Sequence, residues 1–200
     1  MTTTRLEAFS DGVIAILITI MVLELKVPHS AELAALRPVL PTFLSYVLSF
    51  VFLGIYWSNH HHMLHATRHV DGAIMWANLH LLFWLSLVPL ATEWMGTTWP
   101  AALPTAAYGV VLLLAAVAYT ALQATIIARQ GEHSRLAEAV GRDRKGKLSL
   151  ALYAAAVPLA FTHPWVAAGL YVTVALIWLV PDRRIERAIA HAPELEAGAD

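Results

Sequence analysis

The stretch that decides the fold covers residues 5–28, RLEAFSDGVIAILITIMVLELKVP. A charged and polar entrance that ends at Asp11 leads into an almost uninterrupted run of isoleucine, leucine and valine, which ends near Glu24. About 18 or more consecutive apolar residues suit a helix that crosses the hydrocarbon core of a bilayer. No small-residue cleavage site follows the run, so we expect a permanent transmembrane helix and not a removable signal peptide.

The composition of the whole chain is typical of an integral membrane protein. Its 200 residues are 58% hydrophobic and 14% charged, and the mean hydropathy is +0.62, whereas a soluble domain is nearer half apolar and a quarter charged. The formal net charge of −1 offers no basic excess for nucleic acid, so we expect no such partner. The absence of cysteine excludes disulfides, thiolate metal sites and cysteine nucleophiles.

Apolar runs bounded by charge, proline or glycine predict an all-α protein with six transmembrane helices. The first four runs are near the expected length, and the last two are shorter and predict a tight helical hairpin. The six-helix domain covers residues 1–181 and leaves a polar tail at 182–200. The predicted spans are Phe9–Val27, Phe43–Met63, Gly72–Met95, Thr105–Ala128, Leu148–Phe161 and Trp165–Val180.

Lysine and arginine are distributed unequally between the predicted loops. Only Lys26 and Arg37 fall on one side, and the other 11 of the 13 basic residues fall on the side that holds both ends of the chain. Because basic residues concentrate in cytoplasmic loops, we expect a multi-pass membrane protein with both termini in the cytoplasm.

One face of the first span carries a stripe of five residues at helical spacing: Gly12, Ile16, Thr19, Ile20 and Leu23. Symmetry-related copies of this stripe around an axis would stack into a hydrophobic constriction, which can gate by dewetting. The alternative is that the stripe faces lipid or a neighbouring helix. The Thr19 hydroxyl can coordinate a dehydrated cation or bond back to its own helix.

Asp11 lies at the predicted membrane boundary, where a buried carboxylate is costly unless it is paired. It can serve a functional site, or it can cap the helix together with Ser10. A structural polar network would satisfy both interpretations.

A run of histidines ends the second span, and it has two interpretations. His61 and His65 share one helical face and could bind a metal, yet only Asp71 offers a nearby carboxylate and no H-E-x-x-H motif is present. The alternative is a polar helix end at the cytoplasmic interface. The segment contains His60, His61, His62 and His65.

Three motifs in the first half of the chain resemble the transmembrane protein 175 family of potassium channels, in its bacterial six-helix form. An R-x-x-x-F-S-D motif opens the first span, a Y-W-x-x-H-H segment lies in the second, and N-L-x-L-L-F-x-x-S-L-x-P lies in the third. From the fourth span onward, only hydrophobicity and topology agree. The residues that carry the motifs are Arg5, Phe9, Ser10, Asp11, Tyr56, Trp57, His60, His61, Asn78, Leu79, Leu81, Leu82, Phe83, Ser86, Leu87 and Pro89.

The resemblance implies a homotetramer whose first helices line a central pore, without a separate pore loop or a carbonyl filter. The sequence agrees in lacking the T-V-G-Y-G motif of other potassium channels. By the same resemblance, Ile16 forms the main constriction, Ile20 and Leu23 add further rings, and Thr19 contributes hydroxyl groups. The implied polar network that holds the first helix consists of Arg5, Phe9, Ser10, Asp11, Trp57, His61 and Asn78.

These observations predict a channel, not an enzyme, that needs no cofactor and passes potassium and other monovalent cations. An isoleucine ring supplies no oxygen ligands, so we expect only a modest preference for potassium, which dehydrates more easily than sodium. Glu24, present once in each of the four copies, is the candidate source of negative charge at the pore vestibule, and Lys26 partly offsets this charge. A secondary transporter is the alternative, although it favours broken helices with ionisable groups at the midplane. A membrane metalloenzyme ranks third.

Overall fold

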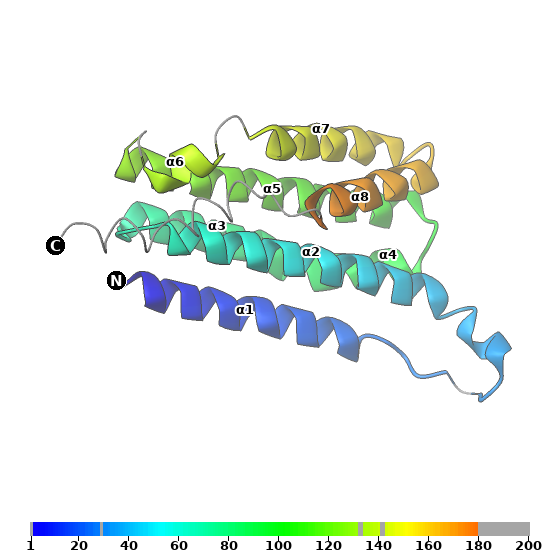
Figure 1. Ribbon diagram of the computed structural model, residues 1–200. Helices are drawn as coiled ribbons and strands as arrows, with labels where there is room; N and C mark the ends of the chain where they lie inside the picture. The colour runs from blue at the N-terminus through cyan, green and yellow to red at the C-terminus, as the bar shows by residue number, and fades with distance from the viewer. Residues whose placement is uncertain (1, 29, 132–133, 141–142, 180–200) are drawn as a thin grey trace.

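The computed structural model describes residues 2–28, 30–131, 134–140 and 143–179, and within these ranges the secondary structure is helical (Figure 1). The predicted all-α class is therefore confirmed. The elements, in chain order, are α1 (Thr3–Leu23), the 3₁₀ helix η1 (Leu33–Leu36), α2 (Leu40–His65), α3 (Gly72–Ser86), α4 (Val88–Thr97), α5 (Ala102–Gln130), α6 (Arg135–Val140), α7 (Arg144–Leu159) and α8 (Pro164–Leu179).

Four helical segments are long and apolar enough to cross a membrane. They are α1, α2, α5 and the combined stretch of α3 and α4, with 21, 26, 29 and 26 residues. Helices α7 and α8 lie where the last two spans were predicted, but each has 16 residues, or about 24 Å, against a hydrocarbon core of about 30 Å. The chain is a multi-pass membrane protein. The predicted tail at 182–200 lies outside the described residues.

The third predicted span is divided into α3 and α4 at Leu87. Pro89 occupies the first turn of α4, where its missing N–H and fixed φ are tolerated. In a continuous helix the same proline would remove the hydrogen bond to the carbonyl of Leu85 and clash with that carbonyl. The break therefore has a local cause, and the two halves still share one membrane-length stretch.

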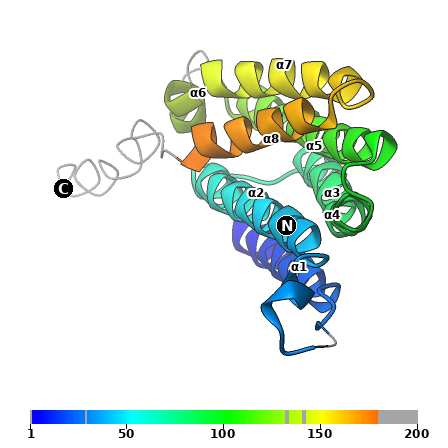
Figure 2. The ribbon, with the colours of Figure 1, turned by 90° about the vertical axis from the view of Figure 1, so that its right-hand side faces the viewer.

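Two hydrophobic clusters build the bundle, and both draw on α2 and α5. The first joins α1, α3 and the near sides of α2 and α5, around Leu53, Leu81 and Leu122. The second joins α4, α7 and α8 to the other sides of α2 and α5, around Leu112 and Tyr171. Figure 2 shows the consequence: α1 lies at one edge of the bundle and the α7–α8 hairpin lies at the opposite edge.

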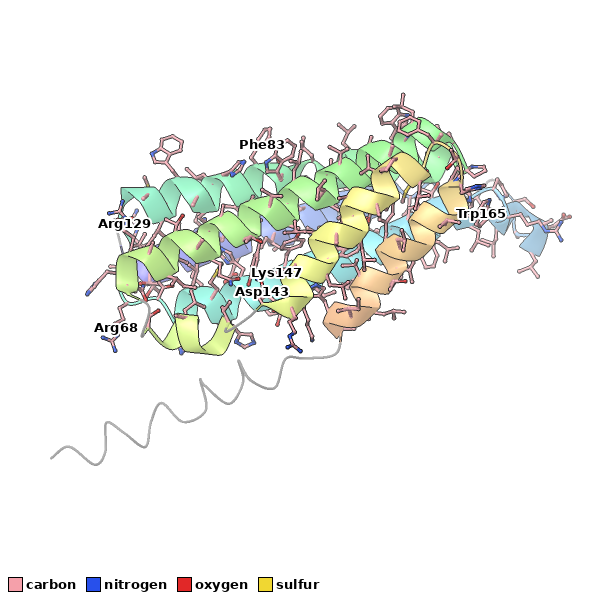
Figure 3. The ribbon with its side chains drawn as sticks, turned by 90° about the horizontal axis from the view of Figure 1, so that it is seen from above. Arg68, Phe83, Arg129, Asp143, Lys147 and Trp165 are labelled. Atoms are coloured by element: carbon pink, nitrogen blue, oxygen red, sulfur yellow. The ribbon has the colours of Figure 1, made fainter. Side chains whose placement is uncertain are left out.

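The two ends of the bundle can be defined by labelled residues (Figure 3). At the Arg129 end, the guanidinium of Arg129 pairs with Asp71 (Nε to Oδ2, 3.1 Å) and joins the end of α5 to the start of α3. At the Trp165 end, the rings of Trp99 and Trp165 meet edge to face, with centroids 4.7 Å apart. Helix α1 starts at the Arg129 end and runs toward the Trp165 end (Figure 1).

Candidate ion pathway on α1

Helix α1 has two sharply different faces. Its buried face holds the helix against α2, α3 and α4, and it consists of Leu6, Ser10, Ile14, Leu17 and Met21. These residues recur at intervals of three and four, as expected for one side of a helix. The fold therefore fixes α1 by one side and leaves the other side of this membrane-length helix without a packing partner among the described residues.

The predicted pore stripe occupies that open side. The side chains of Ile16, Ile20 and Leu23 are 57%, 40% and 80% exposed, and Gly12 and Thr19 on the same side are exposed as well. Isolated exposed leucines are ordinary, but a continuous apolar stripe on a membrane helix faces either lipid or another subunit. In the part of the chain that the structure describes, no other helix covers this stripe.

Thr19 is the only hydroxyl in the middle of the stripe. Its Oγ1 donates a hydrogen bond to the carbonyl of Ile16 at 2.9 Å, which is the helix back-bond anticipated from the sequence. That bond uses the hydroxyl proton and leaves the oxygen lone pairs directed away from the helix backbone. The back-bond is therefore compatible with a Thr19 oxygen that accepts a cation.

Glu24 caps the C-terminal end of α1 and is half-buried. A helix C-terminus carries a partial negative charge, so Glu24 adds a full negative charge to a site that is already negative. Lys26 is exposed two residues later. This end of α1 thus combines a local negative potential with one opposing cation.

A buried polar cluster joins α1 to α2 and α3 near the Arg129 end. Ser10 donates to the carbonyl of Leu6 (2.8 Å) and accepts from the Asn78 amide (Nδ2 to Oγ, 3.0 Å). The Asn78 carbonyl oxygen accepts from His60 Nε2 at 2.6 Å. All three side chains are at most 1% exposed. We refer to Ser10, His60 and Asn78 as the α1 cluster.

A second set of contacts pins the same part of α1 to α2 from outside. The indole N–H of Trp57 donates to Asp11 Oδ1 at 3.0 Å. Glu7 Oε1 lies 2.6 Å from His61 Nδ1, and the His61 ring stacks on Trp57. Asp11 is thus a partner of an aromatic side chain from α2 and not an N-cap, because α1 already begins at Thr3.

The structure brings together most, but not all, of the predicted network. Ser10 meets Asn78, Asp11 meets Trp57, and His61 contacts Glu7 and stacks on Trp57. The predicted members Arg5 and Phe9 lie on the exposed side of α1, and the Arg5 side chain makes no hydrogen bond or ion pair with another described residue.

Two residues that take part in these contacts, His60 and Glu7, were not predicted as members of the network. His60 shares the buried face of α2 with Leu53 and Leu64, at helical spacing, so its periodicity was the available signal. Glu7 lies four residues before Asp11 on one face of α1, which places both carboxylates toward the same neighbour. The His60 ring keeps one buried nitrogen, Nδ1, without a partner.

The histidine run does not gather into a metal-ligand set. Among the described residues, no group of three or more histidine or acidic side chains is arranged to hold a metal ion. His61 and His65 stack ring on ring, with centroids 6.1 Å apart, and His60 points into the α1 cluster. The contacts are those of a polar helix end.

Known proteins resemble this chain in sequence and in fold. The family model described as endosomal/lysosomal potassium channel TMEM175 matches residues 5–89, which include nearly all of α1, the histidine run and Asn78. The chain also resembles a crystal structure described as a lysosomal potassium-selective channel TMEM175 homolog from Chamaesiphon minutus. That match has a TM-score of 0.77 and 28% identity, and it covers 89% of this chain and 96% of the other.

Two bacterial relatives extend the match along the sequence. A potassium channel of Streptomyces collinus is 37% identical over 126 residues, 59% of this chain and 61% of its own length. A potassium channel of Chryseobacterium sp. (strain P1-3) is 54% identical over 189 residues, which are 94% of this chain and 98% of that protein. Because this similarity runs almost from end to end in both proteins, the chain belongs to the TMEM175 family of channels.

Proposed function

We propose that four copies of this chain form a potassium channel whose pore is lined by α1. The observation that carries the proposal is the open side of α1, where Ile16, Ile20 and Leu23 are exposed on a helix whose other side is fully packed. One copy supplies one such helix and cannot enclose a pore by itself. Four stripes around an axis give stacked apolar rings with Ile16 as the main constriction.

Ion discrimination in such a pore comes from the cost of moving a partly dehydrated ion through an apolar ring. Isoleucine offers no oxygen to replace lost water, so the preference for potassium over sodium is modest. Thr19 hydroxyl oxygens next to the Ile16 ring give a passing ion brief coordination. Glu24 at the end of α1 favours cations over anions, and Lys26 reduces its effect.

The proposal includes the orientation of the chain. Both termini lie in the cytoplasm of a bacterial cell, since 11 of 13 lysine and arginine residues fall on that side. The Arg129 end of the bundle, with the α1 cluster, is then cytoplasmic. The Trp165 end, with Glu24, is extracellular.

The natural absence of cysteine provides a clean test of the pore assignment. Leu23→Cys places thiols on the stripe, where four copies around an axis can bind Cd²⁺. Val22→Cys is the matched control, because Val22 is 46% exposed but points about 100° away around the helix. We expect Cd²⁺ to block potassium flux into liposomes through the Leu23→Cys channel only.

Two results would contradict the proposal. Equal sensitivity of both cysteine variants to Cd²⁺ would place the stripe away from the pore. Wild-type liposomes that carry no potassium flux would remove the channel itself. In wild-type liposomes we expect potassium and sodium to pass, with potassium ahead by less than about tenfold, and a bulky organic cation to be excluded.

A further inference from the structure

A pocket lies on the opposite side of the bundle from the α1 stripe, between α2, α5, α7 and α8. It has about 500 Å³ of empty space, which includes its open mouth. Its walls are aliphatic and aromatic side chains, with few polar atoms. The main contributors are Phe52, Ile55, Tyr56, Tyr119, Tyr153 and Trp178.

The start of α7 lies inward from the Arg129 end (Figure 3) and forms one wall of the pocket. Asp143, directly before α7, lines the pocket beside Thr120 of α5. Thr120 precedes the end of α5 at Gln130 by ten residues, which is about 15 Å of helix. Figure 3 shows Asp143 and Lys147 set well inward from Arg129. The first turn of α7 therefore lies within the depth of the membrane-length helices.

This first turn is strongly basic. Asp143 is the single acidic group, and its carboxylate already accepts the backbone N–H of Gly146 at 3.0 Å. The turn has three basic side chains against this one carboxylate, so its formal charge is +2. Within the described ranges, the side chains of Arg144 and Lys147 make no hydrogen bond or ion pair, and both residues are exposed. The basic residues of the turn are Arg144, Lys145 and Lys147.

We propose that this pocket binds an anionic phospholipid, with an acyl chain between the aromatic walls and the phosphate on the basic turn of α7. Cationic side chains at membrane depth need a counter-charge, because hydrocarbon does not solvate them. Basic pockets between transmembrane helices bind anionic headgroups, and an apolar cavity beside them suits the chain of the same molecule. The lipid fills the space that the short hairpin leaves next to α2 and α5.

The test is lipid retention by the full-length protein, measured by native mass spectrometry after incubation with equimolar phosphatidylglycerol and phosphatidylcholine. We expect the wild type to keep phosphatidylglycerol in preference. Lys147→Gln should weaken this retention about fivefold, since each basic residue near an anionic headgroup contributes about that factor. Arg68→Gln is the matched control, because Arg68 is exposed at the Arg129 end, away from the pocket (Figure 3), and it should retain the lipid like the wild type.

A second pair of variants tests the acyl chain. Ala116 lines the pocket, so Ala116→Leu fills it and should reduce phosphatidylglycerol retention severalfold. Ala121→Leu makes the same substitution at an exposed alanine of α5 that does not line the pocket, and it should leave retention unchanged. Equal retention of the two lipids by the wild type, or unchanged retention in both Lys147→Gln and Ala116→Leu, would overturn the proposal. The readout does not depend on ion conduction, so it is independent of the proposed channel activity.

Discussion

Two polar clusters stabilise the bundle, and only one of them includes α1. The α1 cluster joins α1, α2 and α3 through an amide, an imidazole and a hydroxyl. The second, which we call the hydroxyl cluster, joins α2, α4 and α5: Ser49 lies 2.6 Å from the Thr92 hydroxyl and 2.8 Å from the Tyr108 hydroxyl. The clusters have similar burial but hold different parts of the molecule.

The difference shows how α1 is attached. Toward the Arg129 end, α1 is fixed by the directional hydrogen bonds of Ser10, and by Asp11 and Glu7 beside it. Toward the Trp165 end, its buried contacts are apolar, through Leu17 and Met21. Apolar contacts allow sliding and rotation more readily than hydrogen bonds of fixed geometry. Damage to the α1 cluster should therefore alter conduction, whereas damage to the hydroxyl cluster should alter stability alone.

The largest effect in this comparison is expected from Asn78→Leu. The substitution leaves His60 Nε2 and the Ser10 hydroxyl without their shared partner in a buried site. We expect the free energy of unfolding to fall by about 2 kcal/mol, as for other buried groups that lose a partner, and the potassium flux per folded channel to change at least severalfold. Denaturation in mixed micelles and liposome flux measure the two quantities. Unchanged flux would show that the cluster does not position α1.

A smaller effect, on stability only, is expected from Ser49→Ala. It removes the hydroxyl that links Thr92 and Tyr108, but the Thr92 hydroxyl keeps its bond to the carbonyl of Val88 (2.6 Å). We expect a loss of about 1 kcal/mol in unfolding free energy, the usual worth of one such hydrogen bond, with normal flux per folded channel. A change in conduction as large as that of Asn78→Leu would remove the distinction between the clusters.

The smallest effect is expected from Trp57→Phe. Phenylalanine keeps the ring but loses the indole N–H that donates to Asp11. Because the Trp57 and Asp11 contact is partly exposed, we expect a stability change of about 0.5 kcal/mol, and a change in flux smaller than that of Asn78→Leu. Asp11→Asn, which keeps an acceptor oxygen for the same indole, is the comparison variant. A larger effect from Trp57→Phe than from Asn78→Leu would reverse the order of importance.

The sequence predicted most of the helical architecture, because helix length and hydropathy are local properties. The predicted second span falls inside α2, the first starts inside α1 but was placed four residues past its end at Leu23, and the proline at position 89 explains the division of the third. The short lengths of α7 and α8 could also be predicted, because they depend on local sequence, and each helix falls short of a full span. The packing of α7 and α8 against α2 and α5 could not be predicted, because contacts between distant segments produce no periodic pattern in the sequence.

The sequence predicted which face of α1 carries the candidate site, but it did not predict which side chains contact one another. Helical spacing separated the stripe of Ile16, Ile20 and Leu23 from the buried face of α1. It could not decide between His60 and His61 as the partner of Asn78, since adjacent residues differ by only 100° and the rotation of α2 is set by tertiary packing. The motif resemblance indicated which helices meet, and the structure was needed to identify which atoms do.

The most direct test of the central claim is potassium flux into liposomes that contain the purified wild type, Ile16→Asn or Val22→Asn. Asparagine at position 16 wets the proposed constriction, so we expect faster flux or a weaker preference for potassium over sodium. Asparagine at position 22 places the same polar group on another side of α1 and should leave both properties unchanged. Flux that is indifferent to position 16, or that responds equally at both positions, would contradict a pore lined by the α1 stripe.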